Sequence, residues 1–365
     1  MGDIMASLFD PFTINRMELR NRFVRSATMD GLANKGIMSD AEIRLYEDLA
    51  GGEIGLIISH GIAPTREGQT GQGQLVAYTD EAIPSLKKMA DIVHSKGGRI
   101  VAQFLHAGWR ARQETSGLPP VGPSDTVNPD SGAKIKGLSD DEIHELVESY
   151  IRATRRVIDA GFDGVQLHGA HSWLLSAFFS PVTNKRQDEW GGSPEKNANL
   201  ARSICRGIRR MAGPDFPIMV KIGIKDYHPE GKSAEEGIIQ ARLLQEDGVD
   251  AIEVSEGLEL EGAHHIRREA LHPYYLDECA QARKALSLPL ILVGGMRELR
   301  DMQAVLDSGV ADAISMCRPF IMDPHLVRHL REGSADSSKC ISCNRCLGQI
   351  RQGQLRCTEV IDIGR

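Results

Sequence analysis

The 365-residue chain lacks several features that would place it in a familiar functional class. It contains no run of 18 apolar residues, so we expect no transmembrane helix and no membrane partner. The N-terminal stretch has an early acidic residue, Asp3, and no basic segment, so we predict no secretory signal peptide. Neither GxGxxG nor GxxxxGKS/T occurs, which argues against a doubly wound nucleotide-binding sheet.

Charge and cysteine content exclude further classes. The formal net charge is −7 and the basic residues form no stripe, which argues against nucleic acid as the main partner. The chain has 7 cysteines, an odd number, and four of them follow residue 339. A disulfide scaffold would distribute them differently, so we expect a reducing cytoplasmic location and metal-binding thiolates.

A repeated strand–helix pattern runs along the chain. Gly161, Gly248 and Gly309 each come shortly before an Asp and a short apolar run. Glycine often closes a helix in the left-handed conformation, and short apolar runs are typical of parallel strands buried on both faces. Eight such runs are predicted as strands: FVRSA from 23, GLIIS from 55, RIVAQF from 99, GVQLH from 164, PIMVKI from 217, AIEVS from 251, LILVG from 290 and AISMC from 313.

Helix start signals separate these runs. Capping boxes of the form S-x-x-E begin at Ser39, Ser139 and Ser233, and Ser193 followed by proline predicts a further helix start. Eight strand–helix units without an antiparallel hairpin signature predict a TIM (β/α)8 barrel over residues 1–333. The remaining residues, 334–365, form a short cysteine-rich segment. In such barrels the chemistry lies at the C-terminal ends of the strands.

The predicted strand ends carry polar residues. His168 and His171 follow the fourth strand and would bind a metal or donate hydrogen bonds to one substrate oxygen. The loop that follows these histidines has no acidic residue before Asp188, which favours the second interpretation. Gln103 on the third strand suits the amide edge of a heterocycle, or is an interior glutamine bonded to backbone. Lys221 lies in an apolar run and needs an anionic partner, which its own strand does not supply.

The last two strands end in residues suited to phosphate. Gly294 and Gly295 let backbone N–H groups approach an anion, and Arg318, after Cys317, offers a bidentate guanidinium. Loops after the seventh and eighth strands commonly form the phosphate site of this fold. Together these strand ends indicate a phosphorylated heterocycle lying across the barrel mouth.

The sequence as a whole resembles the Old Yellow Enzyme class of FMN-dependent oxidoreductases, in the branch that contains trimethylamine dehydrogenase and bacterial 2,4-dienoyl-CoA reductase. The resemblance covers essentially the whole chain in order. It is carried by LRNRFVRSAT (19–28), QFLHAG (103–108), GFDGVQLHGAH (161–171), FSPVTNKRQDEWGGS (179–193), FPIMVKI (216–222) and the C-terminal cysteines.

The resemblance implies bound FMN and NADH or NADPH as the electron donor. It places His168 and His171 at the oxygen of a small-molecule substrate. It also places Lys221 beside N1 and O2 of the flavin, so that the flavin is the anionic partner of Lys221. The other flavin contacts that it implies are Ser26, Ala27, Thr28, Met29, Gly61, Gln103, Gly294, Gly295, Cys317 and Arg318.

The implied reaction transfers hydride from the nicotinamide to FMN, and from FMN to the β-carbon of an activated alkene. Trp173 stands where the family usually has a proton-donating tyrosine, and an indole N–H does not deliver a proton. The replacement donors that we consider, beside water, are Tyr227, His228, His264 and His265.

Two other functions stay open. Trp109 and Trp173 would form an aromatic wall for a cationic amine, which indicates oxidation of N-methylated amines. An electron-transfer module for a protein partner is the other alternative, and the acidic balance disfavours a role in tRNA reduction. We also expect a homo-oligomer.

The stretch KCISCNRC, from 339 to 346, introduces the cysteine-rich segment. Cys340, Cys343 and Cys346, with Cys357 further on, follow the spacing that is typical of a [4Fe-4S] cluster. Structural zinc usually takes two separated C-x-x-C pairs; zinc and a disulfide remain alternatives. Relatives in this branch often continue into a Rossmann-type domain. The chain stops at Arg365, so we expect hydride to reach FMN directly or electrons to arrive through the cluster from a partner protein.

Overall fold

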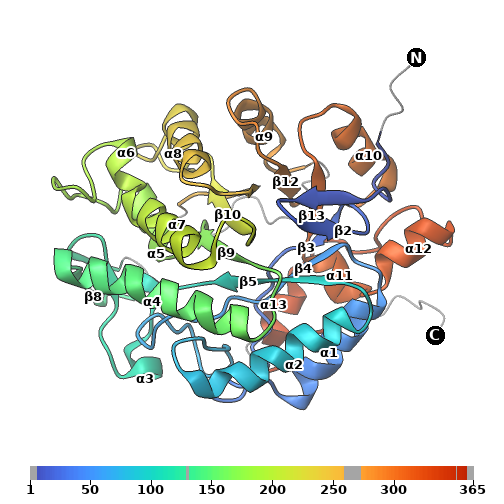
Figure 1. The fold of residues 1–365 in the computed structure, drawn as a ribbon, viewed down its shortest axis with the longest axis horizontal. Helices are drawn as coiled ribbons and strands as arrows, with labels where there is room; N and C mark the ends of the chain where they lie inside the picture. Colours follow the sequence, from blue (N-terminus) through green and yellow to red (C-terminus); the bar gives the residue numbers. More distant parts are fainter. Residues whose placement is uncertain (1–5, 129–130, 259–272, 351, 360–365) are drawn as a thin grey trace.

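The computed structural model describes residues 6–128, 131–258, 273–350 and 352–359. Eight parallel strands close into a barrel, in the order β3-β4-β5-β9-β10-β11-β12-β13, and the last pairs with the first (Figure 1). They are β3 (Phe23–Arg25), β4 (Leu56–Ile58), β5 (Arg99–Phe104), β9 (Gly164–Gly169), β10 (Ile218–Gly223), β11 (Ala251–Ser255), β12 (Leu290–Val293) and β13 (Ala313–Met316). Each strand falls in one of the eight predicted apolar runs, and only β9 and β10 extend one residue beyond it, so the predicted TIM barrel is confirmed.

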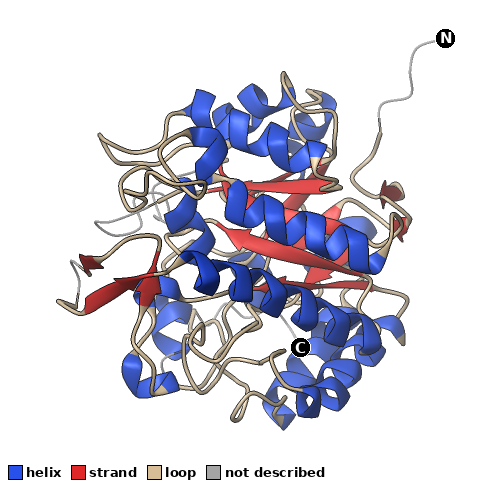
Figure 2. Ribbon diagram, turned by 60° about the vertical axis from the view of Figure 1, so that its left-hand side comes forward, coloured by secondary structure: helices blue, strands red, loops and turns tan. Residues whose placement is uncertain are grey.

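Helices surround the strands on the outside, as Figure 2 shows. The longer ones are α1 (Asp40–Gly51), α2 (Ile83–His94), α4 (Asp140–Asp159), α7 (Asn199–Ala212), α8 (Ala234–Glu246), α9 (Leu276–Arg283), α10 (Leu299–Asp307) and α12 (Leu326–Glu332). The short ones are η1 (Asp80–Ala82), η2 (Gly108–Arg110), α3 (Gln113–Ser116), α5 (Leu174–Phe179), α6 (Pro194–Asn197), α11 (Arg318–Met322) and α13 (Arg345–Ile350). In the described part of the chain, none is long and apolar enough to cross a bilayer.

The predicted helix ends are largely confirmed, with one correction. Ser139 and Ser233 form complete capping boxes at the starts of α4 and α8. Ser39 caps α1 through its hydroxyl, but the side chain of Glu42 does not reach back to it. Glu42 is instead fully buried against His60, because an ion pair to that imidazole is available beneath the helix.

An antiparallel hairpin that the sequence pattern does not indicate precedes the first barrel strand. Strands β1 (Phe12–Ile14) and β2 (Met17–Leu19) form a hairpin, and Asn15 in its turn has φ +52°. Each strand has three residues, too few to show an alternating pattern in the sequence. The chain forms a second small sheet in the segment that connects β5 to α4. It contains β6 (Val121–Gly122), β7 (Thr126–Val127) and β8 (Lys134–Gly137).

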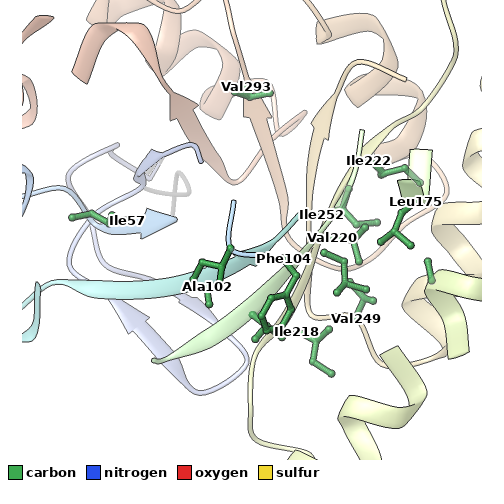
Figure 3. Close-up of a cluster of buried hydrophobic side chains, with 14 of the residues drawn as sticks. Ile57, Ala102, Phe104, Leu175, Ile218, Val220, Ile222, Val249, Ile252 and Val293 are labelled. Atoms are coloured by element: carbon green, nitrogen blue, oxygen red, sulfur yellow. The ribbon is translucent and has the colours of Figure 1, made fainter. Parts of the chain in front are cut away.

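The barrel strands have two buried faces of different composition. Outward-facing side chains such as Val220 and Ile252 pack against the helices (Figure 3). The inward-facing residues form an apolar layer, and the β1–β2 hairpin packs against it and closes this end of the barrel. The layer contains Val24, Leu56, Ile58, Val101, Met219, Ala251, Ile291 and Ala313, and the hairpin contributes Ile14, Met17 and Leu19.

A buried ionic cluster lies between β3, β4 and α1. The Nε2 atom of His60 is 3.0 Å from Oε1 of Glu42, and its Nδ1 atom is 3.6 Å from Oδ1 of Asp30. The guanidinium of Arg25 lies over the ring of Tyr46, 5.6 Å from its centroid. All five side chains are buried, so the two carboxylates depend on His60 and Arg25 for charge compensation.

Candidate active site at the barrel mouth

A layer of polar side chains lies directly above the apolar layer. In several strands it is reached by moving two residues toward the C-terminus, because side chains in a strand alternate between its two faces. The step runs from Val24 to Ser26, Met219 to Lys221, Ala251 to Glu253 and Ala313 to Ser315. The barrel interior therefore changes from apolar to polar within one layer, at the end where the strands finish.

Glu253 is the centre of this polar layer. Its Oε1 atom accepts hydrogen bonds from the hydroxyls of Ser26 and Ser315, both at 2.7 Å. Its Oε2 atom accepts one from the amide of Gln166 at 2.9 Å, and Gln166 in turn accepts one from Gln103 at 2.7 Å. Gln103, expected at the edge of a heterocycle, thus takes part in a side-chain network.

Lys221 has an anionic partner within the protein. Its Nζ atom lies 3.3 Å from Oε1 of Glu253 and donates to the hydroxyl of Ser26 at 2.8 Å. Lys221 and Glu253 are in register on the neighbouring strands β10 and β11, so the backbone pairing places them together. Glu253 is thus a protein partner for this lysine, on the next strand, in addition to the flavin that the resemblance implies.

Glu253 is ionised in this setting. Burial alone would raise its pKa, but Lys221 and the donors Ser26, Ser315 and Gln166 lower the pKa below its usual value. The carboxylate therefore carries a negative charge that is fully buried and fully hydrogen-bonded.

The two predicted histidines meet at the end of β9. Their ring centroids lie 5.1 Å apart, with the planes at 83°. His168 is in register with Lys221 and shares a strand face with Gln166, so it lies above the polar layer. The backbone N–H of Ala170 donates to Nδ1 of His168 at 3.3 Å, which leaves the proton of the neutral ring on Nε2. Nε2 of His171 lies 2.7 Å from the Ser255 hydroxyl.

Both histidines are neutral. Burial, then His171 and Lys221, lower the pKa of His168 well below its usual value. Burial, Lys221 and Arg110 lower the pKa of His171 to about 3. A neutral imidazole donates one hydrogen bond without carrying a charge, so the pair is suited to a substrate oxygen.

The loop that carries His171 has an unusual backbone. His171 and Ser172 both occupy the left-handed region, with φ of +56° and +61°. Successive non-glycine residues in this region are strained, and such strain gathers at functional sites. The indole of Trp109 donates to the carbonyl of Ser172 at 2.5 Å, which supports the loop.

The two tryptophans do not form the predicted aromatic wall. Trp109 is buried and packs with Ile135, Ala177 and Leu258. The guanidinium of Arg110 lies 5.9 Å from the ring centroid of Trp173, so a protein cation already lies over that ring.

The remaining predicted flavin residues line the same end of the barrel. Ser26 and Thr28 are buried, Ala27 is partly buried, and Met29 is 43% exposed. A Cβ on Gly61 would lie 2.6 Å from the Cβ of Leu105. The close approach there requires glycine.

The predicted phosphate residues are arranged around Tyr274. Gly294 and Gly295 both have positive φ, and a Cβ on Gly294 would lie 2.7 Å from the ring of Tyr274. Arg318 donates to the hydroxyl of Tyr274 at 3.2 Å and to Oδ1 of Asn344 at 2.8 Å. Bare backbone and a guanidinium therefore lie together, as an anionic group requires.

Of the four predicted proton donors, the structure describes Tyr227 and His228. Tyr227 donates to Glu278 at 2.8 Å, and burial together with Glu278 raises its pKa. The Nδ1 atom of His228 accepts from the backbone N–H of Glu230 at 3.1 Å. His264 and His265 lie outside the described residues.

The four C-terminal cysteines line one cavity. Cys340, Cys343, Cys346 and Cys357 surround it together with Arg318. Burial, then the neighbouring thiols, raise the pKa of Cys346 to about 11, and Cys317 is the first of those neighbours. The hydroxyl of Thr28 donates to the sulfur of Cys317 at 3.1 Å, so Cys317 lies between the predicted flavin residues and the cysteines. The division at residue 333 stays a prediction.

Sequence reasoning missed three residues of this site: Gln166, Glu253 and Ser255. The signal was present, because Glu253 stands in a strand of apolar residues and has the same parity as Ala251 in the inner layer. The partner of Lys221 lies on the neighbouring strand β11 instead of on its own strand.

The mouth of this TIM barrel carries a neutral histidine pair, a buried lysine, and glycines beside an arginine. This is the layout of a flavin-dependent oxidoreductase. The profile of the NADH:flavin oxidoreductase / NADH oxidase family matches residues 7–337. The chain belongs to this family and is an FMN-dependent oxidoreductase.

Several relatives support this assignment. The chain is 30% identical to the 4,4'-dithiodibutanoate disulfide reductase of Rhodococcus erythropolis, over 95% of this chain and 94% of that protein. It is 34% identical to the NADH oxidase of Thermoanaerobacter brockii, over 96% of this chain and 55% of the relative. A solved complex of 2-naphthoyl-CoA reductase with 2-naphthoyl-CoA has a TM-score of 0.91 at 26% identity, over 96% of this chain and 56% of that one. The chain thus spans just over half the length of the last two.

Proposed function

We propose that the protein reduces an activated alkene, such as an enone or an enoyl compound, with NADH or NADPH as the electron donor. The observation that carries the proposal is the neutral histidine pair above the polar layer, with the proton of His168 on Nε2. FMN, when bound, would accept hydride from the nicotinamide and supply it to the β-carbon of the alkene, and water would supply the proton to the α-carbon. The flavin residues named above, with Lys221, would hold it.

The histidines polarise the substrate. His168 donates from Nε2 to the substrate oxygen, which gains negative charge as hydride arrives, and His171, whose Nε2 contacts the Ser255 hydroxyl, would donate from Nδ1. Because burial keeps both rings neutral, each ring donates through a single N–H. Lys221 and Arg110 contribute positive potential, which favours the developing anion further. A preorganised donor of this kind contributes about 3 kcal/mol to transition-state stabilisation.

The alternative of amine oxidation has less support. Trp109 is buried in its own cluster, and Arg110 lies over Trp173. A cationic amine would meet the positive potential of Arg110 and Lys221 instead of a bare aromatic face. The same potential suits substrates that carry a carbonyl, a carboxylate or a thioester.

The test is anaerobic turnover of the FMN-loaded protein with three substrate panels: enones and enoyl thioesters, N-methylated amines, and organic disulfides. We expect the alkenes to oxidise the NADH-reduced protein and the amines to leave the oxidised protein unchanged. Disulfides form the third panel because a relative is named for disulfide reduction. Turnover confined to amines or disulfides would contradict the proposal, as would reoxidation by a ferredoxin-like protein alone.

We also propose that the four C-terminal cysteines bind a [4Fe-4S] cluster. All four are free thiols around one cavity. Zinc–sulfur bonds of about 2.3 Å would place the sulfurs about 3.8 Å apart. The groups of described residues whose ligand atoms lie within 4.8 Å of one another do not include these cysteines. No three of these four sulfurs therefore all lie within 4.8 Å of one another, which favours a cluster over one zinc ion bound by all four.

Iron content tests the cluster. Protein purified without oxygen should contain about four iron atoms per chain, and Cys343→Ser should lose most of them because one corner ligand is missing. Cys205→Ala is the matched control, since Cys205 is buried in the core away from the other cysteines. Metal analysis and EPR of the reduced protein give the readout. One zinc per chain without iron would contradict the assignment.

A further inference from the structure

We infer that Glu253 is a positioning residue that offsets the charge of Lys221 beneath the flavin and thereby lowers the reduction potential of the bound FMN. The inference rests on the FMN-binding part of the proposed function, with Lys221 beside the flavin. It does not depend on which substrate reoxidises the enzyme.

The contacts fix the carboxylate in place. Oε1 of Glu253 accepts hydrogen bonds from the hydroxyls of Ser26 and Ser315 and lies 3.3 Å from Nζ of Lys221. Oε2 accepts a hydrogen bond from the amide of Gln166. Glu253 is 0% exposed and Lys221 3% exposed, so solvent screens neither charge appreciably. The parallel register of β10 and β11 sets Lys221 opposite Glu253, so the pair does not depend on a flexible loop.

The electrostatic consequence follows from the sign of the two charges. A flavin gains negative charge when it is reduced, and an isolated buried ammonium would favour the reduced form strongly. A carboxylate beside that ammonium repels the same negative charge and cancels part of the gain. Since both charges lie in the polar layer at the barrel mouth, the flavin experiences their sum. The reduced form is then less favoured, and is a stronger hydride donor, than with Lys221 alone.

Potentiometric titration of the FMN-loaded protein under nitrogen tests this. Glu253→Gln keeps the size and one carbonyl acceptor but removes the negative charge. We expect the reduction equilibrium to shift about tenfold or more toward reduced FMN, which is about 30 mV or more for a two-electron couple. Glu253→Asp, which keeps the charge, should remain close to wild type.

Glu278→Gln is the matched control. Glu278 is a buried glutamate that pairs with a lysine, 2.7 Å from Lys225, but it lies outside the polar layer. Its removal should leave the potential unchanged. A purely structural effect of losing a buried carboxylate would appear in the stability of both variants and would not raise the potential of one.

The double variant Lys221→Met/Glu253→Gln separates the outcomes. We expect Lys221→Met to lower the potential and the double variant to lie above it. This comparison still tests Glu253 if Glu253→Gln alone does not fold. Equal potentials in Lys221→Met and the double variant, together with no rise in Glu253→Gln, would overturn the inference and leave the proposed function intact. If Lys221→Met changes neither the potential nor the FMN affinity, the proposed position of the flavin fails, and the inference with it.

Discussion

His168→Ala should lower the rate constant for reoxidation of the reduced enzyme by an enone about 100- to 1,000-fold, because one preorganised donor to the developing oxyanion is lost. The neighbouring Ala170 N–H fixes the tautomer of His168, so the wild-type donor is already oriented before substrate arrives. Stopped-flow measurement of this half-reaction under nitrogen gives the rate. Reduction of the flavin by NADH is the internal control and should change little, since it forms no substrate oxyanion.

His171 needs a different substitution. Its φ of +56° makes alanine unsuitable, because backbone strain would add to the loss of the donor. Asparagine tolerates this conformation and retains an N–H, so His171→Asn and His168→Asn should both keep more activity than His168→Ala. Unchanged enone reoxidation in His168→Ala would show that the pair does not bind the substrate oxygen.

His60→Gln should destabilise the protein by about 3 kcal/mol at pH 6, because it leaves Asp30 and Glu42 buried with less compensating charge. Burial alone would lower the pKa of His60, but these two carboxylates raise the pKa above its usual value despite the opposing charge of Arg25. Stability against urea, measured from the loss of circular dichroism, gives the free energy of unfolding.

The contribution of His60 to the free energy of unfolding should decrease as the pH rises. A histidine whose folded-state pKa lies above its unfolded value of about 6.5 stabilises the folded protein fully below that value. The stabilisation is lost as pH rises through the folded pKa, so the gap between wild type and His60→Gln should narrow at alkaline pH. Burial is the main cause that raises the pKa of Asp30, so Asp30 also makes the folded protein less stable as the pH rises.

His94→Gln is the control for this experiment. His94 also contacts a carboxylate, Asp163, at 2.7 Å, but its side chain is 33% exposed. We expect at most about 1 kcal/mol of destabilisation. A gap between His60→Gln and wild type that does not change with pH would contradict the assignment of a charged His60.

The elements that sequence analysis predicts best are those determined by local patterns. The glycines after α4, α8 and α10 do adopt positive φ, at Gly161, Gly248 and Gly309. The complete capping boxes at Ser139 and Ser233 depend only on residues three apart. The eight strands are likewise predicted from local patterns, because each apolar run is separated from the next by signals for the start or end of a helix.

What sequence analysis missed depends on pairing between distant segments. Glu253 and Lys221 are 32 positions apart and meet only because β10 and β11 are in register. Glu42 matched a capping box, yet it turns inward because His60, on another strand–helix unit, lies beneath it. The aromatic wall failed for the same reason, since nothing local indicates that Arg110 lies over Trp173.

The apolar layer closed by the β1–β2 hairpin restricts how protons from solvent reach the polar layer. Below Lys221 and Glu253 the barrel is filled with hydrocarbon side chains, and Ile14 and Leu19 of the hairpin are fully buried against them. Water and hydronium therefore reach the polar layer from one side only, through the mouth that the flavin would cover. A bound flavin would cover that opening, so we expect it to slow the exchange of water with the polar layer around Glu253.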